Sequence, residues 1–339
     1  MVDSKTALEF KELDSETRKM IKKLFPGERG GFVRFGPKGY ILTERYKEMA
    51  ADIYNMEIRS SDVFVVTYPR SGTTWTQEIA WMLVNDLDYK TSSSIVLPER
   101  FPCLEGAMIL YPSLKQEILE EKNHDPHAKK MLELFSETLV EPLAAAPSPR
   151  FIKSHLPISL LSPNLLDAKV IYVARDPRDA AVSLYHLCSS LRSIAFEEEF
   201  KTFWNLFIND LVYWTPYFEH LKEAWAKRNH PNLLFIFYEE LQKDLKDVVN
   251  RVADFLGKKY NAEQIDGLCD HLNFENFKTN VAVNYELLKD INLVDYKNEF
   301  IRKGKTGGWR NYFDEEMTAQ ADKWMEENLR DTDLRFPTI

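Results

Sequence analysis

Four short apolar runs rich in β-branched residues constrain the fold of this chain most strongly. The runs are Val63–Thr67, Phe151–Ser154, Lys169–Ala174 and Leu233–Phe237. Most are followed by segments with helical periodicity, at 74–85, 177–190 and 242–256. Buried strands that alternate with helices are typical of βαβ units. The sequence therefore predicts an α/β fold with a central, mostly parallel sheet flanked by helices, and a ligand site at the carboxyl ends of the strands.

No change in composition or linker divides the 339 residues, so we expect a single domain spanning 1–339, with a poorly defined N-terminal segment at 1–30. A hydrophobic content of 44% and a charged content of 29% are ordinary for a globular protein. The net charge of −9 argues against broad nucleic-acid binding, which usually requires a basic face. Any anion must therefore be held by a local cluster of cations.

The three cysteines, Cys103, Cys188 and Cys269, are far apart and show neither metal-site nor disulfide spacing. We therefore expect no metal site. The first twenty residues have no apolar core of a signal peptide, and no apolar run approaches the roughly 20 residues of a membrane span. These features predict a cytoplasmic protein without a membrane partner.

Two further segments stand out along the chain. Residues 111–149 are charged and helix-prone and end in a Pro-Ser-Pro turn. Either a lid or a solvated connector fits this pattern. Pro216 interrupts the aromatic-rich stretch 199–227 and predicts a kinked or broken helix there, because proline cannot donate a backbone hydrogen bond.

The stretch TYPRSGTTW, residues 67–75, joins the first predicted strand to its helix. Against the phosphate-loop pattern GxxxxGK[ST], it has Thr67 at the first glycine, Gly72 at the second, Thr73 at the lysine and Thr74 at the final position. The strand, the glycine turn and the helix N-terminus that favour an anion all remain. Arg70 adds a permanent charge in mid-loop. The alternative is that these residues only cap the helix.

Lys153 and His155, in FIKSHLP, stand two residues apart near the end of the second predicted strand, so both project from one face. An imidazole that titrates near neutrality can accept a proton from a hydroxyl, and a neighbouring ammonium can stabilise developing charge. The alternative is a hydrogen-bonded core histidine beside a surface lysine.

Two more clusters are basic. Arg175 ends the third predicted strand, where a second phosphate contact is expected, although pairing with a carboxylate fits equally well. Near the C-terminus, IRKGKTGGWR at 301–310 combines Arg302, Lys303 and Lys305 with three glycines. Such a loop is able to close on an anion, and a solvated turn is the alternative.

Five blocks in order give the chain a family resemblance: TYPRSGTTW, IKSHLP, YVARDPRDAAVSLYH, LFIFYEEL and IRKGKTGGW. Together they resemble the cytosolic sulfotransferases over about residues 40 to 325. Arg70 and the long insert are similar to arthropod members of that family, including the retinol dehydratase type. The resemblance implies a single α/β domain that uses 3′-phosphoadenosine 5′-phosphosulfate (PAPS) as sulfuryl donor, releases 3′-phosphoadenosine 5′-phosphate (PAP) and needs no metal.

The resemblance also implies roles for individual residues. The phosphosulfate is expected to lie among Arg70, Ser71, Gly72, Thr73, Thr74 and Trp75. The 3′-phosphate contacts are expected from Arg175, Ser183, Arg302, Lys303 and Gly304. Tyr238 and Phe274 match adenine contacts, with Trp75 nearby. His155 matches the catalytic base, and Lys153 and Arg70 match cations that stabilise charge during transfer.

Three positions depart from the family pattern. Arg70 replaces a lysine, and arginine keeps its charge but cannot give up its proton, which removes proton donation to the leaving group. Leu272 stands where the adenine pocket often has a hydroxyl. Residues 310–319 replace the usual dimerisation element, so the usual family dimer contact is in question.

The resulting hypothesis is sulfuryl transfer to a small apolar hydroxyl compound of the phenol, sterol or retinoid class. Residues around Phe101, Met108, Tyr111 and the aromatics at 199–218 could line its pocket, although core packing explains most of them. Three alternatives remain: a magnesium-dependent kinase, a non-catalytic binder of the nucleotide or a hydrophobic ligand, and a net dehydratase that acts through a sulfated intermediate.

Overall fold

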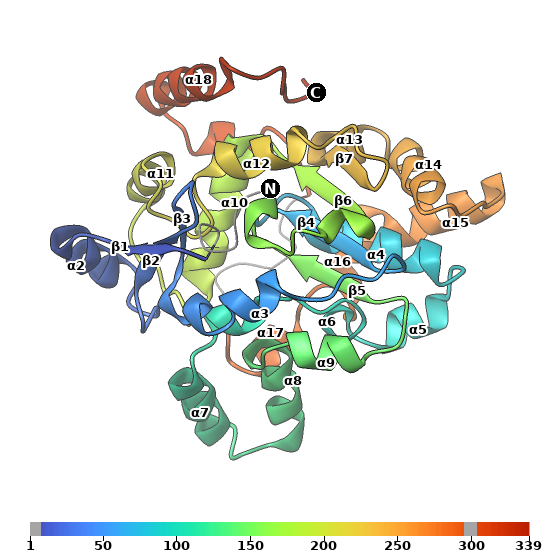
Figure 1. The fold of residues 1–339 in the computed structure, drawn as a ribbon, viewed down its shortest axis with the longest axis horizontal. Helices are drawn as coiled ribbons and strands as arrows, with labels where there is room; N and C mark the ends of the chain where they lie inside the picture. The colour runs from blue at the N-terminus through green and yellow to red at the C-terminus, as the bar shows by residue number, and fades with distance from the viewer. Residues whose placement is uncertain (1–7, 295–303, 339) are drawn as a thin grey trace.

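A four-stranded parallel sheet forms the centre of the computed structural model, which describes residues 8–294 and 304–338 (Figure 1). The strand order is β5-β4-β6-β7. The strands are β4 (Val63–Thr67), β5 (Phe151–Ser154), β6 (Lys169–Ala174) and β7 (Leu233–Phe237). All four agree with the predicted strands, and the predicted α/β class is confirmed.

The register of the sheet places three loops at one edge. Val65 in β4 lies opposite both Lys153 in β5 and Ile171 in β6. Because the strands are parallel, the loop after each strand leaves from the same side of the sheet. The segments that start at Tyr68, His155 and Arg175 therefore open toward a common space.

Each face of the sheet is covered by its own apolar core. Val63 and Val65 pack on one face with α4 (Thr73–Val84), α14 (Leu245–Phe255) and α15 (Ala262–Leu272). Phe64 and Val66 pack on the other face, as expected for side chains that alternate along a strand. That second core includes residues from three more helices: α10 (Pro177–Ser190), α11 (Phe200–Ile208) and α12 (Tyr217–Trp225).

A small antiparallel sheet near the N-terminus was not predicted. It contains β1 (Phe10–Glu12), β2 (Phe32–Phe35) and β3 (Tyr40–Thr43), with α2 (Ser15–Leu24) between the first two strands. Ile41 exchanges backbone hydrogen bonds of 2.8 Å with Trp214 and Thr215. These partners are distant in sequence, so the short strands carry little local signal. Part of the segment 1–30 is thus ordered secondary structure.

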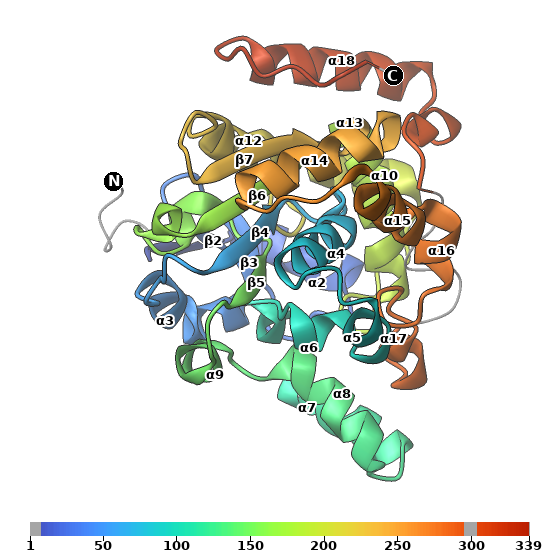
Figure 2. The same ribbon diagram turned by 90° about the vertical axis from the view of Figure 1, so that its right-hand side faces the viewer.

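The insert 111–149 forms three helices: α7 (Pro112–Glu121), α8 (Pro126–Ser136) and α9 (Val140–Ala145). Helices α7 and α8 project from the body on the side opposite α18 (Glu315–Leu329) (Figure 2). The insert buries Leu114, Ile118, Met131, Leu132 and Leu143 in the main core. It is therefore packed against the domain and is not a detached helix pair.

Two predictions about helix boundaries have different outcomes. The expected break at Pro216 is confirmed, because α11 ends at Ile208 and α12 begins at Tyr217. The helix expected at 242–256 is confirmed over Leu245–Phe255, but its predicted start is wrong. The chain there forms α13 (Tyr238–Lys243) and α14, which are divided at Asp244, whose side chain accepts from the Asp247 amide and caps α14.

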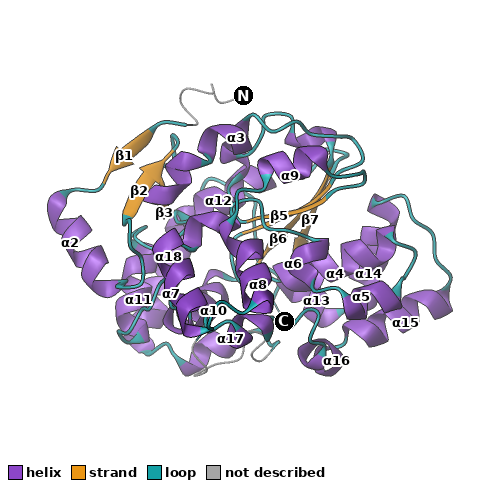
Figure 3. Ribbon diagram, turned by 90° about the horizontal axis from the view of Figure 1, so that it is seen from below, coloured by secondary structure: helices purple, strands orange, loops and turns teal. Residues whose placement is uncertain are grey.

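Shorter helices complete the layers around the strands (Figure 3). They are α3 (Ala50–Tyr54), α5 (Tyr89–Ser94), α6 (Leu97–Arg100), α16 (Phe274–Thr279) and α17 (Leu287–Asp290). The segment 310–319 packs within its own chain, where Phe313 contacts Trp204. In the described ranges no helix combines the length and apolar character that crossing a bilayer requires.

Candidate active site

A cavity of about 230 Å³ lies at the carboxyl edge of the central sheet. Every predicted site residue that the structure describes lines it, except Ser71. The lining residues from the prediction are Arg70, Gly72, Thr73, Thr74, Trp75, Lys153, His155, Arg175, Ser183, Tyr238, Phe274 and Gly304. Arg302 and Lys303 fall outside the described residues. Residues predicted from separate parts of the sequence thus meet in one place.

The loop between β4 and α4 has a backbone that requires glycine at one position. Gly72 is the N-cap of α4 and has a φ of 101°. A Cβ atom there would lie 2.8 Å from the ring of Tyr238. Arg70 also adopts a left-handed conformation, with a φ of 68°. The loop therefore turns tightly and presents the N-terminus of α4 to the cavity, where backbone N–H groups favour an anion.

Hydroxyl groups near this helix start differ in their bonding. Thr73 Oγ1 lies 2.7 Å from Thr67 Oγ1, so the residue at the lysine position of the phosphate-loop pattern is tied back to β4. Ser71 Oγ is buried and has no hydrogen-bond partner among the described residues. A buried hydroxyl without a partner is costly unless a ligand satisfies it.

Arg70 and Arg175 bring two positive charges to the same wall. Arg70 Nε donates to Ser183 Oγ at 3.0 Å, and an Arg175 terminal nitrogen donates to the Arg70 carbonyl oxygen at 2.8 Å. The Arg175 guanidinium lies 4.2 Å from the ring centroid of Tyr238. Its Nε is buried and finds no acceptor within residues 8–294 and 304–338. This N–H group is available to an anionic ligand.

Aromatic side chains line the neighbouring end of the cavity. The rings of Trp75 and Tyr238 are 6.3 Å apart, and Trp75 donates through Nε1 to the Leu272 carbonyl oxygen at 2.9 Å. Gly304 has a φ of 55°, and a Cβ atom there would lie 2.1 Å from the Phe274 ring. Only glycine allows the C-terminal loop to pass so close to this ring.

The C-terminal loop is anchored to α10 by a buried carboxylate. Asp179 accepts hydrogen bonds from the amides of Gly307 at 2.6 Å and Trp309 at 3.0 Å. Arg175 reaches the same loop through the Lys305 carbonyl oxygen at 3.3 Å. Asp179 was not singled out in the sequence, although an acidic residue in the first turn of a predicted helix is a weak signal.

His155 follows β5, and its imidazole carries its proton on one identifiable nitrogen. Nδ1 lies 3.0 Å from the Thr67 carbonyl oxygen, which can only accept a hydrogen bond, and 3.2 Å from Thr67 Oγ1, which can also accept one. Nδ1 must therefore donate, and Nε2 of the neutral ring holds the lone pair. Burial and the positive charge of Lys153 hold the pKa of His155 well below its ordinary value. The ring is thus neutral at physiological pH and able to accept a proton.

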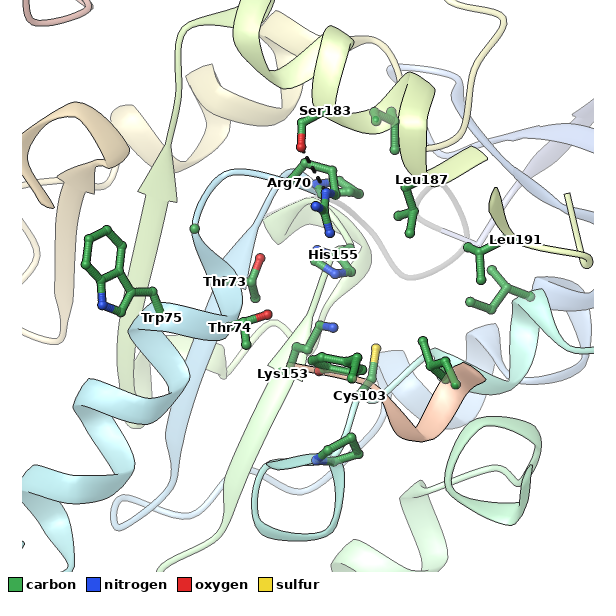
Figure 4. Close-up of a pocket in the computed structure, with 18 of the residues that line it drawn as sticks. Arg70, Thr73, Thr74, Trp75, Cys103, Lys153, His155, Ser183, Leu187 and Leu191 are labelled. Atoms are coloured by element: carbon green, nitrogen blue, oxygen red, sulfur yellow. Dashed lines mark hydrogen bonds between the residues drawn. The ribbon is translucent and has the colours of Figure 1, made fainter. Parts of the chain in front are cut away.

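Lys153 lies two residues earlier, and its side chain faces the same cavity (Figure 4). Burial lowers its pKa, but Tyr285, Cys103 and Glu105 around it more than offset this effect, so the net pKa lies above the ordinary value. The amine is therefore a permanent cation beside the neutral imidazole.

The side of the cavity opposite Trp75 is apolar (Figure 4). Leu187 of α10, Leu191 directly after that helix and Phe135 of α8 contribute to it. Phe101 and Trp214 also line the cavity, whereas Met108 and Tyr111, which were considered with them, do not. Sequence reasoning missed the leucines because their spacing fits ordinary core packing. The insert therefore supplies part of the cavity wall.

This arrangement combines an anion site with a proton acceptor and an apolar chamber. The N-terminus of α4, Arg70 and Arg175 can hold an anionic donor. His155 can accept a proton from a hydroxyl, and Lys153 can stabilise the negative charge of the group that passes from the donor to that hydroxyl. Transfer of an anionic group to an apolar hydroxyl compound is the chemistry that these groups allow.

Comparison with known proteins identifies the family. The sulfotransferase-domain model matches residues 60–333. Luciferin sulfotransferase of Photinus pyralis is 33% identical over 88% of this chain and 80% of its own length. Sulfotransferase 1E1 of Bos taurus is 31% identical over 90% of this chain and 96% of its own length.

A solved structure extends the similarity to the fold. Retinol dehydratase in a complex with retinol and PAP is 48% identical, covers 97% of this chain and 98% of its own, and has a TM-score of 0.91. The same enzyme in complex with androsterone and PAP has the same TM-score. The site geometry, the family match and these relatives together establish that this chain is an enzyme of the sulfotransferase family.

Proposed function

We propose that this enzyme transfers the sulfuryl group of PAPS to the hydroxyl of a small apolar alcohol or phenol, with His155 as general base. The observation that carries the proposal is the fixed tautomer of His155. Its Nδ1 donates to the Thr67 carbonyl oxygen, so Nε2 remains the proton acceptor on a ring that stays neutral.

The residues of the cavity fit such a donor. Within the described residues neither Arg175 Nε in the cavity wall nor the buried Ser71 hydroxyl of the adjoining loop has a hydrogen-bond partner, so both can donate to anionic oxygens. Gly72 leaves the N-terminus of α4 open for a phosphosulfate, and Tyr238 and Phe274 offer flat surfaces for a purine. Arg175 and Ser183 are the proposed contacts of the 3′-phosphate, together with Gly304. Retinol dehydratase was solved with PAP in both of its complexes, which supports the same donor here.

Each residue of the site has a separate role in the transfer. The acceptor hydroxyl loses its proton to His155 Nε2 as its oxygen bonds to sulfur, while the bond between sulfur and the leaving phosphate oxygen breaks. Lys153 and Arg70 stabilise the negative charge on the transferring and leaving groups. A sulfonate and a phosphate carry less charge than a triphosphate, so a loop with Thr73 in place of lysine suits this donor.

Sulfate transfer from radiolabelled PAPS, without added metal, tests the proposal. The acceptors are a simple phenol, androsterone and retinol, and the variants are His155→Ala and, as a control, His230→Ala at an exposed histidine. We expect labelled organic product with wild type and the control, and a fall of about 10²- to 10⁴-fold in kcat for His155→Ala with PAP binding intact. An equal loss of activity and of PAP affinity would refute the role of His155.

Net dehydration of an allylic alcohol is a second candidate. The 48% identity with retinol dehydratase over nearly the whole chain supports it. Product analysis with retinol separates the two reactions, because sulfation retains the carbon–oxygen bond and dehydration releases a hydrocarbon and inorganic sulfate. A non-catalytic binding protein would give neither product, and the neutral imidazole beside Lys153 argues against it, since binding alone needs no base.

A further inference from the structure

Glu105 is a buried carboxylate directly behind the proposed base. It is 1% exposed and lies at the edge of the cavity. One carboxylate oxygen accepts the backbone N–H of His155 at 2.5 Å, and the other accepts the hydroxyl of Ser154 at 2.9 Å. The carboxylate therefore binds the Ser154 side chain and the His155 backbone amide, and no hydrogen bond joins it to the imidazole itself.

The segment that carries Glu105 runs alongside the end of β5. Lys153 donates its amide to the Pro102 carbonyl oxygen at 2.9 Å, and Leu104 donates its amide to the Lys153 carbonyl oxygen at 2.8 Å. The two pieces of chain thus pair like parallel strands. Glu105 extends this pairing beyond the strand, where the backbone amide of His155 would otherwise lack an acceptor.

The hydrogen-bond directions around Glu105 are determined by their partners. Ser154 Oγ accepts the Leu156 amide at 3.0 Å and directs its own proton to Glu105. Both carboxylate oxygens therefore face donors, which favours the ionised form. These two donors and the charge of Lys153 lower the pKa of Glu105, but burial has the larger effect, so the net pKa lies above the ordinary value. A neutral amide in this position would face at least one of these donors with its own N–H groups.

Two other contacts complete the fixation of His155. Its carbonyl oxygen accepts from His220 Nε2 at 2.9 Å, and its ring donates to Thr67. The backbone amide, the backbone carbonyl and Nδ1 of His155 are thus all hydrogen-bonded, and these bonds fix the direction in which Nε2 points. Catalytic groups held to within about 0.5 Å depend on such supports, and a displacement of about 1 Å can cost roughly 10²-fold in rate.

We infer that Glu105 is a positioning residue for sulfuryl transfer, holding the hydroxyl of Ser154 and the backbone amide of His155 so that the imidazole of His155 meets the acceptor hydroxyl. This inference rests on the proposed role of His155 as base. It assigns to Glu105 an effect on the rate of transfer and little effect on nucleotide binding, because Glu105 accepts from the base-bearing segment and not from the loop at 70–75.

Steady-state kinetics of Glu105→Gln and Glu105→Asp, with PAP binding and thermal unfolding measured on the same proteins, tests the inference. We expect kcat to fall about 10- to 100-fold in both variants. The side-chain NH₂ group of glutamine would face one of the two hydrogen-bond donors, and aspartate is too short to reach both of them. PAP affinity should stay within about twofold of wild type.

Glu223→Gln is the matched control. Glu223 accepts the backbone amide of Ser159 at 2.9 Å and its hydroxyl at 2.8 Å, so it makes the same kind of contact a few residues beyond the site. The Glu223→Gln control should lose about as much thermal stability as Glu105→Gln but keep kcat within about twofold of wild type. If Glu105→Gln also keeps wild-type kcat, or loses kcat and PAP affinity in equal measure, Glu105 has no positioning role.

Two further variants distinguish a failure of the positioning role from a failure of the proposed base. Ser154→Ala removes one donor and leaves the carboxylate in place, so it decides the question if the Glu105 variants do not fold. We expect a fall of about 3- to 10-fold in kcat, and an unchanged kcat would overturn the inference. His155→Ala is measured alongside. Full activity of His155→Ala would overturn the role of His155 as base. If His155→Ala is inactive and Glu105→Gln is fully active, only the positioning role of Glu105 is overturned.

Discussion

Arg70 and Ser183 link the phosphate loop to α10 through a hydrogen bond of 3.0 Å from Arg70 Nε to Ser183 Oγ (Figure 4). Arg70 is the residue that departs from the usual lysine, and Ser183 is the proposed contact of the 3′-phosphate. A lysine has no atom equivalent to Nε and cannot donate at this point while directing its charge into the cavity. The arginine is therefore built into the wall that joins the two ends of the proposed donor site.

Substitution of Arg70 separates its charge from this hydrogen bond. Arg70→Ala should lower kcat/KM for PAPS by more than about 10²-fold, because one of the cations that stabilise the leaving group is lost. Arg70→Lys keeps the charge and should remain within about tenfold of wild type. Both values come from initial rates at varied PAPS. Equal losses in the two variants would show that guanidinium geometry, and not charge, is the contribution of Arg70.

Arg175→Ala tests the proposed 3′-phosphate contact. We expect PAP binding to weaken by about 10- to 100-fold, since a charge-assisted hydrogen bond is worth roughly 1.5–3 kcal/mol. Adenosine 5′-phosphate lacks the 3′-phosphate and should lose little affinity. Isothermal titration of both ligands gives the comparison. Parallel weakening of the two would indicate that Arg175 acts only through its bond to the Arg70 carbonyl oxygen.

The pH dependence of kcat/KM for the acceptor tests the state of His155. Burial and Lys153 lower its pKa well below 6.5, so the neutral, reactive form persists to a lower pH than in a free imidazole. Activity should therefore be flat from about pH 6.5 to 8 and fall only at more acidic pH. An acid limb with its midpoint at or above 6.5 would contradict this environment for His155.

The strands and the donor loop could be predicted from the sequence because their signals are local. A buried parallel strand is a continuous apolar run, and Gly72 before a helix start is a local feature of the backbone. The contacts around Glu105 could not be predicted in the same way. Its partners Ser154 and His155 lie about fifty positions away and meet it only because residues 102–104 pair with β5.

The small N-terminal sheet and the apolar end of the cavity show the same limit. The strands β1 to β3 are three or four residues long and depend on the loop at 214–215 for part of their hydrogen bonding. Leu187 and Leu191 have the spacing of any helix that faces a core. Only the packing of α8 against the body shows that this face borders a cavity. Periodicity identifies a buried face but not what covers it.

Phe135 on α8 tests whether the insert forms part of the acceptor site. Its side chain lines the cavity, and truncation removes apolar surface from the wall. Phe135→Ala should raise KM for retinol or androsterone by about 5- to 50-fold, with PAP affinity unchanged, since burial of an aromatic ring contributes roughly 1–2.5 kcal/mol to such contacts. Lys129→Ala, at an exposed position of the same helix, is the control. An unchanged KM would mean that the insert serves as a connector only.

The buried ion pair between Asp62 and Arg150 fixes the end of the insert to the start of β4. The Arg150 guanidinium donates to both Asp62 oxygens, at 2.8 and 2.5 Å, and the two side chains are 1% exposed or less. Arg150 also donates to the carbonyl oxygens of Glu57 and Leu143. Removal of one partner would leave a buried charge without compensation, which is far more costly than the pair itself is stabilising.

Asp62→Ala should therefore lower the free energy of unfolding by about 3–5 kcal/mol, as measured by urea denaturation. Glu99→Ala breaks the exposed pair between Lys130 and Glu99, where the lysine side chain is 61% exposed, and should cost less than about 1 kcal/mol. A cost for Asp62→Ala as small as that of the surface pair would mean that water reaches Arg150 and solvates its charge.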